Sequence, residues 1–301
     1  MMLAKNKSLG RENIFGSCLM ILSMAAFAGE DSIIKALSAE LPVSQIIFLI
    51  GIGGAVVFLI SGLFLNREIL VSEINSVPMH ARIITEICGR IFYSLALALT
   101  SLSSTTMILQ ATPLVVVAGA AIFFKEKVGV IRWLAIGLGF IGVLLVVSPN
   151  EKEFNLLSLL AILGMLGFAL RDLASRAVSP KLNIFTLGCH GFLSLAVAGI
   201  LLSLILQQPF LTVSEKAWLF LAAGIILGVV GYGSLISAMR IGEVSAITPF
   251  RYTRLIFGLS IGYFIFDENI GFYAGLGCLL IVLSSLVVLY FGKTGRTAYE
   301  P

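Results

Sequence analysis

Charged residues are scarce in this chain of 301 residues. They account for 12% of it, against roughly 25% in an ordinary soluble domain, while hydrophobic residues account for 58%. Long hydrophilic connections are absent as well, since the longest runs only from residue 66 to residue 80. Because this composition leaves no room for a soluble domain, the sequence predicts a polytopic membrane protein whose chemistry resides among its membrane spans.

Cysteine and histidine are also rare, with four and two copies. Cys18, Cys88, Cys189 and Cys278 all lie inside apolar runs without a CxxC pair or metal-ligand spacing, so we interpret them as packed or lipid-facing thiols. No metal and no cofactor is expected. His190 is a candidate proton carrier near neutral pH, and the alternative is a hydrogen-bonded packing residue.

Long apolar runs are what the sequence has in abundance. A helix needs about 20 apolar residues to cross a bilayer, and stretches such as residues 134–147 are continuously apolar, unlike the alternating strands of a barrel. We therefore predict an all-α polytopic membrane protein with ten transmembrane helices. The expected spans are 14–36, 43–65, 81–100, 104–124, 129–148, 155–178, 184–207, 217–240, 245–266 and 270–292.

One pattern of acids and bases occurs twice. FAGEDSIIKALS at 27–38 aligns with FALRDLASRAVS at 168–179, and FFKEKVG at 123–129 aligns with IFDENIG at 265–271. In the first pair Asp31 falls on Asp172. The sequence thus predicts a fused duplication, with one five-helix repeat in residues 1–150 and a second in residues 151–301.

The distribution of Lys and Arg predicts the orientation. With the N-terminus inside, the cytoplasmic connections collect most basic residues and the outside has only Lys35, Lys152 and Lys216. Both termini are then cytoplasmic, in a cytoplasmic (inner) membrane. Because each repeat has an odd number of spans, the second repeat is inverted, as in secondary transporters. No basic segment is interleaved with aromatic residues, so nucleic acid is not an expected partner.

Eight charged residues of the expected spans are the most informative, because a charge inside the membrane is expensive unless it meets a partner or water. Glu86 and Arg90 share a helix face, and the run PFRYTR at 249–254 directs two further arginines toward one cavity. The alternatives are ion pairs that lock helices together and side chains that snorkel to the headgroups. The eight residues are Glu30, Asp31, Glu86, Arg90, Arg171, Asp172, Arg251 and Arg254.

Other polar residues of the spans are candidates to line the cavity. Tyr93, Gln110, Tyr232 and Tyr252 are the main ones, although such residues also act as interhelical hydrogen-bonding partners. Pro113 and Pro249 are expected to break the fourth and ninth helices, because proline removes a backbone donor. A further hypothesis treats the carboxylate and the cation one turn apart in each repeat as gates.

These expected gate pairs are Asp31 with Lys35, toward the outer mouth, and Asp172 with Arg176, toward the cytoplasmic mouth. The alternative is that these pairs only anchor the orientation of their helices in the membrane, because the sequence would look the same in that case. Glu30, Glu86, Arg171 and His190 complete the set of residues expected to serve coupling or gating.

Several of these features resemble the drug/metabolite transporter superfamily, in particular its EamA-domain branch. They are the duplicated set of five helices, Pro113 followed thirteen residues later by Glu126, the ensuing Gly129, and AIGLGFIG at 135–142. The resemblance covers nearly the whole chain. It implies ten helices around a central cavity and alternating access driven by a gradient, and the absence of GxxxxGK[ST] agrees with transport without ATP.

The PFRYTR run resembles one subgroup of that branch, which implies that Arg251 contacts substrate. Many such proteins have an arginine about eight residues after the proline that precedes the second helix, whereas VSQIIFLI after Pro42 has none. A substrate rule taken from those relatives therefore does not transfer directly to this chain.

We interpret the chain as a secondary transporter of a small polar organic metabolite, functional as a monomer. Arg90, Arg251 and Arg254 suggest a carboxylate or phosphate on the substrate, while Glu30 or Glu86 would meet an amino group or a proton. Amino-acid-like compounds fit this pattern. One alternative is an integral-membrane lipid-modifying enzyme, which would need clustered Asp or His. The other is a channel, which would normally use oligomeric symmetry.

Overall fold

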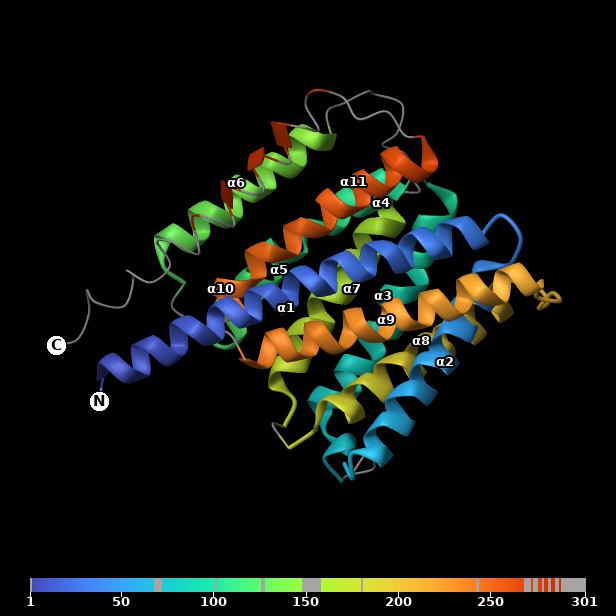
Figure 1. Ribbon diagram of the computed structural model, residues 1–301, viewed down its shortest axis with the longest axis horizontal. Helices are drawn as coiled ribbons and strands as arrows, with labels where there is room; N and C mark the ends of the chain where they lie inside the picture. Colours follow the sequence, from blue (N-terminus) through green and yellow to red (C-terminus); the bar gives the residue numbers. More distant parts are fainter. Residues whose placement is uncertain are drawn as a thin grey trace.

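The computed structural model describes residues 2–67, 72–100, 102–125, 128–147, 158–179, 181–241 and 244–267, with single positions between 272 and 287. All regular secondary structure in these residues is helical, and they form no strand (Figure 1). The elements are α1 (Met2–Leu37), α2 (Val43–Phe64), η1 (Ser72–Asn75), α3 (Val77–Leu99), α4 (Leu102–Leu109), α5 (Thr112–Phe123), α6 (Val130–Val147), α7 (Ser158–Ala177), α8 (Ile184–Leu206), α9 (Glu215–Ile241), α10 (Val244–Ile247), η2 (Thr248–Tyr252) and α11 (Thr253–Phe266).

The all-α class is confirmed. Most of the tenth expected span, 270–292, lies outside the described residues, as do Glu126, Glu268, Gly271 and Cys278 of the sequence analysis.

Four of the helices are long and apolar enough to cross a membrane: Arg11–Leu37, Val43–Phe64, Ile184–Leu206 and Glu215–Ile241. Large apolar side chains also cover the outer surface. Phe64 is 83% exposed, Leu219 72% and Phe264 79%, and a soluble protein rarely exposes so much apolar surface. The protein is therefore a multi-pass membrane protein.

Two helices begin earlier than the apolar runs predict. α1 starts at Met2 instead of residue 14, because helical hydrogen bonds are satisfied within the segment and no proline interrupts residues 2–13. α3 starts at Val77 with Pro78 in its first turn, where a proline is tolerated. As a result Arg82, which the apolar run places at the very start of its span, lies more than one turn inside α3.

Two expected spans are interrupted, as the prolines predict. α4 ends at Leu109 and α5 begins at Thr112, just before Pro113. In the second half α10 is followed by η2, which contains Pro249, and then by α11. Arg251 therefore lies in a 3-10 turn and Arg254 in the first turn of α11, so both guanidinium groups start from a backbone discontinuity.

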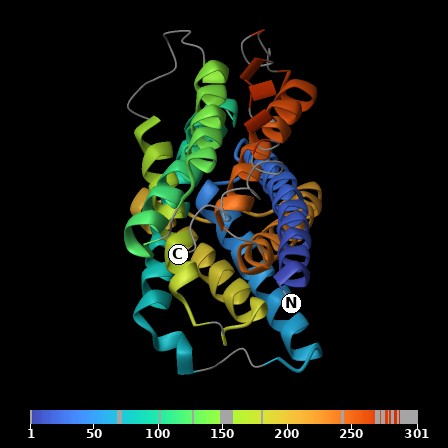
Figure 2. The same cartoon turned by 90° about the vertical axis from the view of Figure 1, so that its left-hand side faces the viewer.

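Three helix pairs make the frame that holds these residues. α1 packs along α9, α3 packs along α7 and α2 packs against α8. Figure 2 shows the first pair, blue and orange, on one side of the molecule and the second, teal and yellow-green, on the other. In the expected duplication α1 corresponds to α7, and α3 corresponds to α9. The pair α1–α9 is therefore the counterpart of the pair α7–α3, as expected for two equivalent repeats.

Glycine permits the closest approaches in this frame. A Cβ atom built on Gly51 of α2 would lie 2.4 Å from the backbone nitrogen of Ala196 in α8. A Cβ atom on Gly167 of α7 would lie 2.5 Å from the Cα atom of Gly89 in α3. Both distances are far below van der Waals contact, so the helix pairs touch backbone to backbone at these points.

Candidate functional site

The charged residues of the spans come together in one buried network. Its four carboxylates belong to Glu30 and Asp31 of α1, Glu86 of α3 and Asp172 of α7, and none of these residues is more than 4% exposed. Residues in hydrocarbon have no water to solvate a charge, so each carboxylate needs a cation or hydrogen-bond donors. The network supplies arginines from α3, η2, α7 and α11.

The first part of the network joins α1 to α11. The Arg254 guanidinium forms an ion pair with Asp31 through Nη2, and its Nε lies 3.2 Å from the same carboxylate oxygen, Oδ2. The Tyr93 hydroxyl of α3 donates a hydrogen bond to this oxygen over 3.0 Å. Two charges and a phenol thus tie three helices together at the start of α11.

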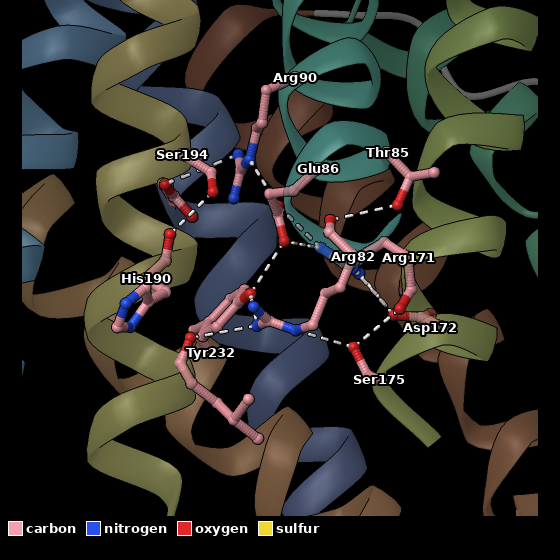
Figure 3. Close-up of polar contacts among 12 residues, drawn as sticks. Arg82, Thr85, Glu86, Arg90, Arg171, Asp172, Ser175, His190, Ser194 and Tyr232 are labelled. Atoms are coloured by element: carbon pink, nitrogen blue, oxygen red, sulfur yellow. Dashed lines mark hydrogen bonds and ion pairs between the residues drawn. The ribbon is translucent and has the colours of Figure 1, made fainter. Parts of the chain in front are cut away.

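The second part centres on Glu86 and is drawn in Figure 3. Its carboxylate accepts a hydrogen bond from Nη1 of Arg171 at 3.1 Å and from the hydroxyl of Tyr232 at 2.8 Å. Nε of Arg90, one turn along α3, lies 3.6 Å away. Glu86 therefore connects α3 with α7 and α9.

With the two remaining carboxylates included, each of the four carboxylates can be assigned to a different arginine. Asp172 lies 2.8 Å from Nη2 of Arg171 and 2.6 Å from Nη1 of Arg251, and Glu30 lies 3.9 Å from Nη1 of Arg90. The matched couples are Arg90 with Glu30, Arg171 with Glu86, Arg251 with Asp172 and Arg254 with Asp31. Each of these four arginines therefore has a carboxylate of its own.

The pairing predicted within each repeat is wrong. Asp31 forms its ion pair with Arg254, while the Lys35 ammonium donates hydrogen bonds to the backbone carbonyls of Leu97 (3.2 Å) and Thr100 (2.7 Å). The two aspartates also belong to one network instead of separate mouths. Spacing along one helix could not reveal this, because Asp31 pairs with an arginine of α11 and Asp172 pairs in part with an arginine of η2.

In the second repeat, too, the expected pair is replaced. Asp172 pairs with Arg171 and Arg251, whereas the Arg176 guanidinium lies 5.3 Å from the ring centroid of Phe124. A cation over an aromatic face is attracted by the ring quadrupole.

Three further predicted residues occupy different places. Gln110 lies at the break between α4 and α5 and, with its amide oriented to satisfy both ends, donates to the Arg251 carbonyl (3.3 Å) and accepts from the Leu255 N–H (3.1 Å). The Tyr252 hydroxyl donates to the carbonyl of Ile136 in α6 (3.1 Å), which directs it away from the carboxylates. The His190 ring is hydrogen-bonded to the Thr186 carbonyl of its own helix at 2.8 Å.

Sequence reasoning missed Arg82. It is 1% exposed and belongs to the same group of side chains, with Nε 2.9 Å from the hydroxyl of Ser175 in α7. A signal was present, because Arg82, Glu86 and Arg90 are spaced four residues apart and therefore share one face of α3. The assumption that the span begins at residue 81 concealed it.

A cavity of about 330 Å³ adjoins the network. It lies between the first half of α3, the second halves of α7 and α9, and the start of α8, and Arg82, Arg171, Asp172, Arg176 and Arg240 supply its charges. Four of these five are cations. A smaller cavity of about 30 Å³, at the two helix breaks, shares Arg171 and Leu235 with it and is lined by Gln110, Arg251 and Arg254 as well.

The opposite end of the helix bundle is held together by polar contacts. Lys35 bridges α1 to the end of α3, as described above. The Gln45 side chain of α2 exchanges two hydrogen bonds with the Leu211 backbone, at 2.7 and 2.8 Å, and the Phe48 and Phe210 rings lie 5.3 Å apart. One end of the bundle therefore has a cavity lined by arginines that can bind an oxyanion. At the other end, hydrogen bonds between helices and a connection hold the bundle closed.

Comparison with known proteins adds independent information. The EamA-like transporter family model matches residues 14–148 and again residues 155–290. An S-adenosylmethionine uptake transporter of Rickettsia prowazekii is 24% identical over 288 residues, which cover 94% of this chain and 95% of the relative. A riboflavin transporter of Vibrio cholerae is 27% identical over 178 residues, 59% of each chain.

A more distant relative and a solved structure extend the comparison. The pseudopaline exporter of Pseudomonas aeruginosa is 22% identical over 284 residues, which cover 91% of this chain and 95% of the exporter. A crystal structure superposes with a TM-score of 0.75 over 93% of this chain and 99% of the other chain, at 17% identity. At that identity the superposition is evidence for the fold alone.

Proposed function

This chain belongs to the EamA-like transporter family, and because its relatives are named as transporters of small molecules, we propose that it is a secondary active transporter of a small polar organic metabolite. The substrate carries a carboxylate or phosphate and is amino-acid-like. Transport follows alternating access and uses an ion gradient, with a proton as the coupling ion.

The observation that carries this proposal is the buried arginine and carboxylate network beside the cavity of about 330 Å³. Such a group of charges at broken helices is typical of midplane substrate sites in transporters. Five arginines, Arg82 included, face four carboxylates, so the site has an excess of one positive charge and favours an anion.

Glu30 is the part of the network suited to an amino group or a proton. It is 1% exposed, and within the described part of the chain neither carboxylate oxygen accepts a hydrogen bond. Arg90, at 3.9 Å, is its matched cation. An ammonium group or a bound proton would satisfy those oxygens. S-adenosylmethionine, which one relative is named for, carries both an α-ammonium and an α-carboxylate group.

We place the two repeats at residues 1–150 and 151–301, with ten helices, inverted topology and both termini in the cytoplasm of an inner membrane. The equivalent packing of α1 with α9 and α3 with α7 supports the duplication. In this orientation the cavity opens toward the cytoplasm, and the contacts of Lys35 and Gln45 close the outer side. The chain acts as a monomer, because its two halves already enclose the site.

Catalysis is a weaker interpretation. A lipid-modifying enzyme would need carboxylates or histidines free to bind metal or phosphate, whereas each carboxylate of this network has a matched arginine. A passive channel would require a continuous path, and the transport measurement below separates it from a coupled transporter.

Transport is tested with the purified protein in liposomes. We expect accumulation of S-adenosylmethionine or another zwitterionic amino-acid derivative above its external concentration when a pH gradient is imposed, and collapse of the accumulation by a protonophore. Riboflavin, which has neither carboxylate nor phosphate, serves as the matched comparison. Equilibration without accumulation would indicate a passive facilitator, and no movement of any carboxylate or phosphate compound would contradict the proposal.

Orientation is tested by thiol labelling in intact cells, in a background whose four native cysteines are serine. A cysteine at Glu215, at the start of α9, should react with an impermeant reagent, because this connection is expected outside. A cysteine at Glu73, in η1, should be protected until the cells are permeabilised. The reverse pattern would show that the N-terminus is external.

A further inference from the structure

Within the described part of the chain, Arg82 donates hydrogen bonds only to neutral groups. Nε donates to the Ser175 hydroxyl at 2.9 Å, and Nη2 donates to the Leu187 carbonyl at 3.1 Å and to the Tyr232 hydroxyl. Figure 3 shows the side chain extended between Tyr232 and Ser175. These contacts come from α7, α8 and α9, so the guanidinium is fixed in position.

This fixed cation forms no direct ion pair with any of the described residues. Among the described residues no carboxylate oxygen lies within 4 Å of Arg82, although the other four arginines of the network each have one. Its Nη1 is buried and, within the same residues, has no hydrogen-bond partner. A buried cation without a counter-ion is strongly unfavourable, and a missing donor partner adds to this.

The cavity of about 330 Å³ provides the place for the missing anion. Arg82 lines it together with Arg171, Arg176 and Arg240, and Ser175 contributes a hydroxyl to the same wall. Guanidinium groups bind carboxylates and phosphates through paired N–H donors. The volume is in the range of small-ligand pockets.

We propose that Arg82 is the residue that binds the anionic group of the substrate, a carboxylate or a phosphate, from the cavity of about 330 Å³. This inference rests on the proposed function and makes it more specific. The initial candidates Arg90, Arg251 and Arg254 hold helices together through their own carboxylates, whereas Arg82 is the arginine of the network that has no carboxylate within 4 Å among the described residues.

The proposal predicts that a counter-ion built into the protein will displace the ligand. In Ser175→Asp, a carboxylate replaces the hydroxyl that lies 2.9 Å from Nε of Arg82. Ser175→Asn is the matched control, since it has nearly the same shape without the charge. Both variants retain Arg82, so neither removes the contacts that Arg82 makes with α8 and α9.

Binding is measured on the purified full-length protein in detergent, as the rise in unfolding temperature with sodium phosphate or sodium acetate against sodium chloride at equal ionic strength. We expect at least one of these oxyanions to stabilise the wild type. Ser175→Asp should unfold at a higher temperature without ligand and should bind the oxyanion ~10- to 100-fold more weakly, while Ser175→Asn stays close to wild type. The phosphate and acetate arms distinguish the two oxyanion classes.

Arg82→Gln should lose the same stabilisation, and Arg82→Lys should keep part of it, because the charge remains without the planar fork. Undiminished binding in Ser175→Asp, or no stabilisation of the wild type by either oxyanion, would overturn the assignment. Liposome transport is a separate readout. Oxyanion binding that Ser175→Asp abolishes in a protein that moves no substrate would contradict the proposed function and still support Arg82 as the anion site.

Discussion

Glu86→Gln is expected to give the largest loss of stability of any single substitution in the network. The carboxylate accepts hydrogen bonds from Arg171 and Tyr232 and also faces Arg90. Its neutralisation leaves Arg171 and Arg90 with one carboxylate fewer in a buried site, and breaking a buried ion pair costs about 3–5 kcal/mol. We expect a large fall in the unfolding temperature in detergent and loss of transport in liposomes.

The exposed pair of Lys181 and Glu73 is the matched control. Its atoms lie 3.0 Å apart, close to the 3.1 Å of Arg171 and Glu86, yet the Lys181 side chain is 79% exposed. Glu73→Gln should change stability by less than about 1 kcal/mol, because water screens the pair. Equal effects of Glu86→Gln and Glu73→Gln would show that burial does not set the strength of the Glu86 pair.

The second large effect is expected for Arg254→Gln, which should abolish transport. Among the described residues it leaves the buried Asp31 with the Tyr93 hydroxyl as its single hydrogen-bond donor. Asp31→Asn alone should lower stability and transport to a similar extent, because it leaves the Arg254 guanidinium without its carboxylate. The double variant removes both charges and should recover most of the unfolding temperature, since loss of both partners is far less costly than loss of one.

Transport by the double variant then separates two roles of this pair. If the two charges only hold α1 and α11 together, the double variant should recover transport to the same extent as it recovers its unfolding temperature. We expect it to fold and not to transport, because the pair lies beside the small cavity at the helix breaks. Arg67→Gln, which removes an exposed arginine outside the network, is the control for a change of net charge.

Much of the architecture follows from hydrophobic patterning. Apolar runs long enough to cross a bilayer predicted the helical spans, and Pro113 and Pro249 predicted the two breaks, because a missing N–H interrupts the backbone ladder wherever the proline lies. The helix starts at Met2 and Val77 were not predictable from the same signal. Hydropathy predicts which residues contact lipid, whereas the backbone hydrogen bonds of a helix can continue into polar residues outside the membrane.

The list of charged residues was likewise available from the sequence, since any charge inside an apolar span needs a partner. Which residue would be that partner was not. Spacing along α1 and α7 favoured Lys35 for Asp31 and Arg176 for Asp172, but long side chains near helix ends reach backbone carbonyls or an aromatic ring instead.

Only the tertiary structure decided the matching, because it brings arginines from α3, η2, α7 and α11 against carboxylates of other elements. It also singled out Arg82. In the sequence this residue is one of twenty Lys and Arg, and its lack of a carboxylate partner among the described residues is a property of distances between helices. Local sequence thus determines which charges enter the membrane, and helix packing determines which of them pair with one another.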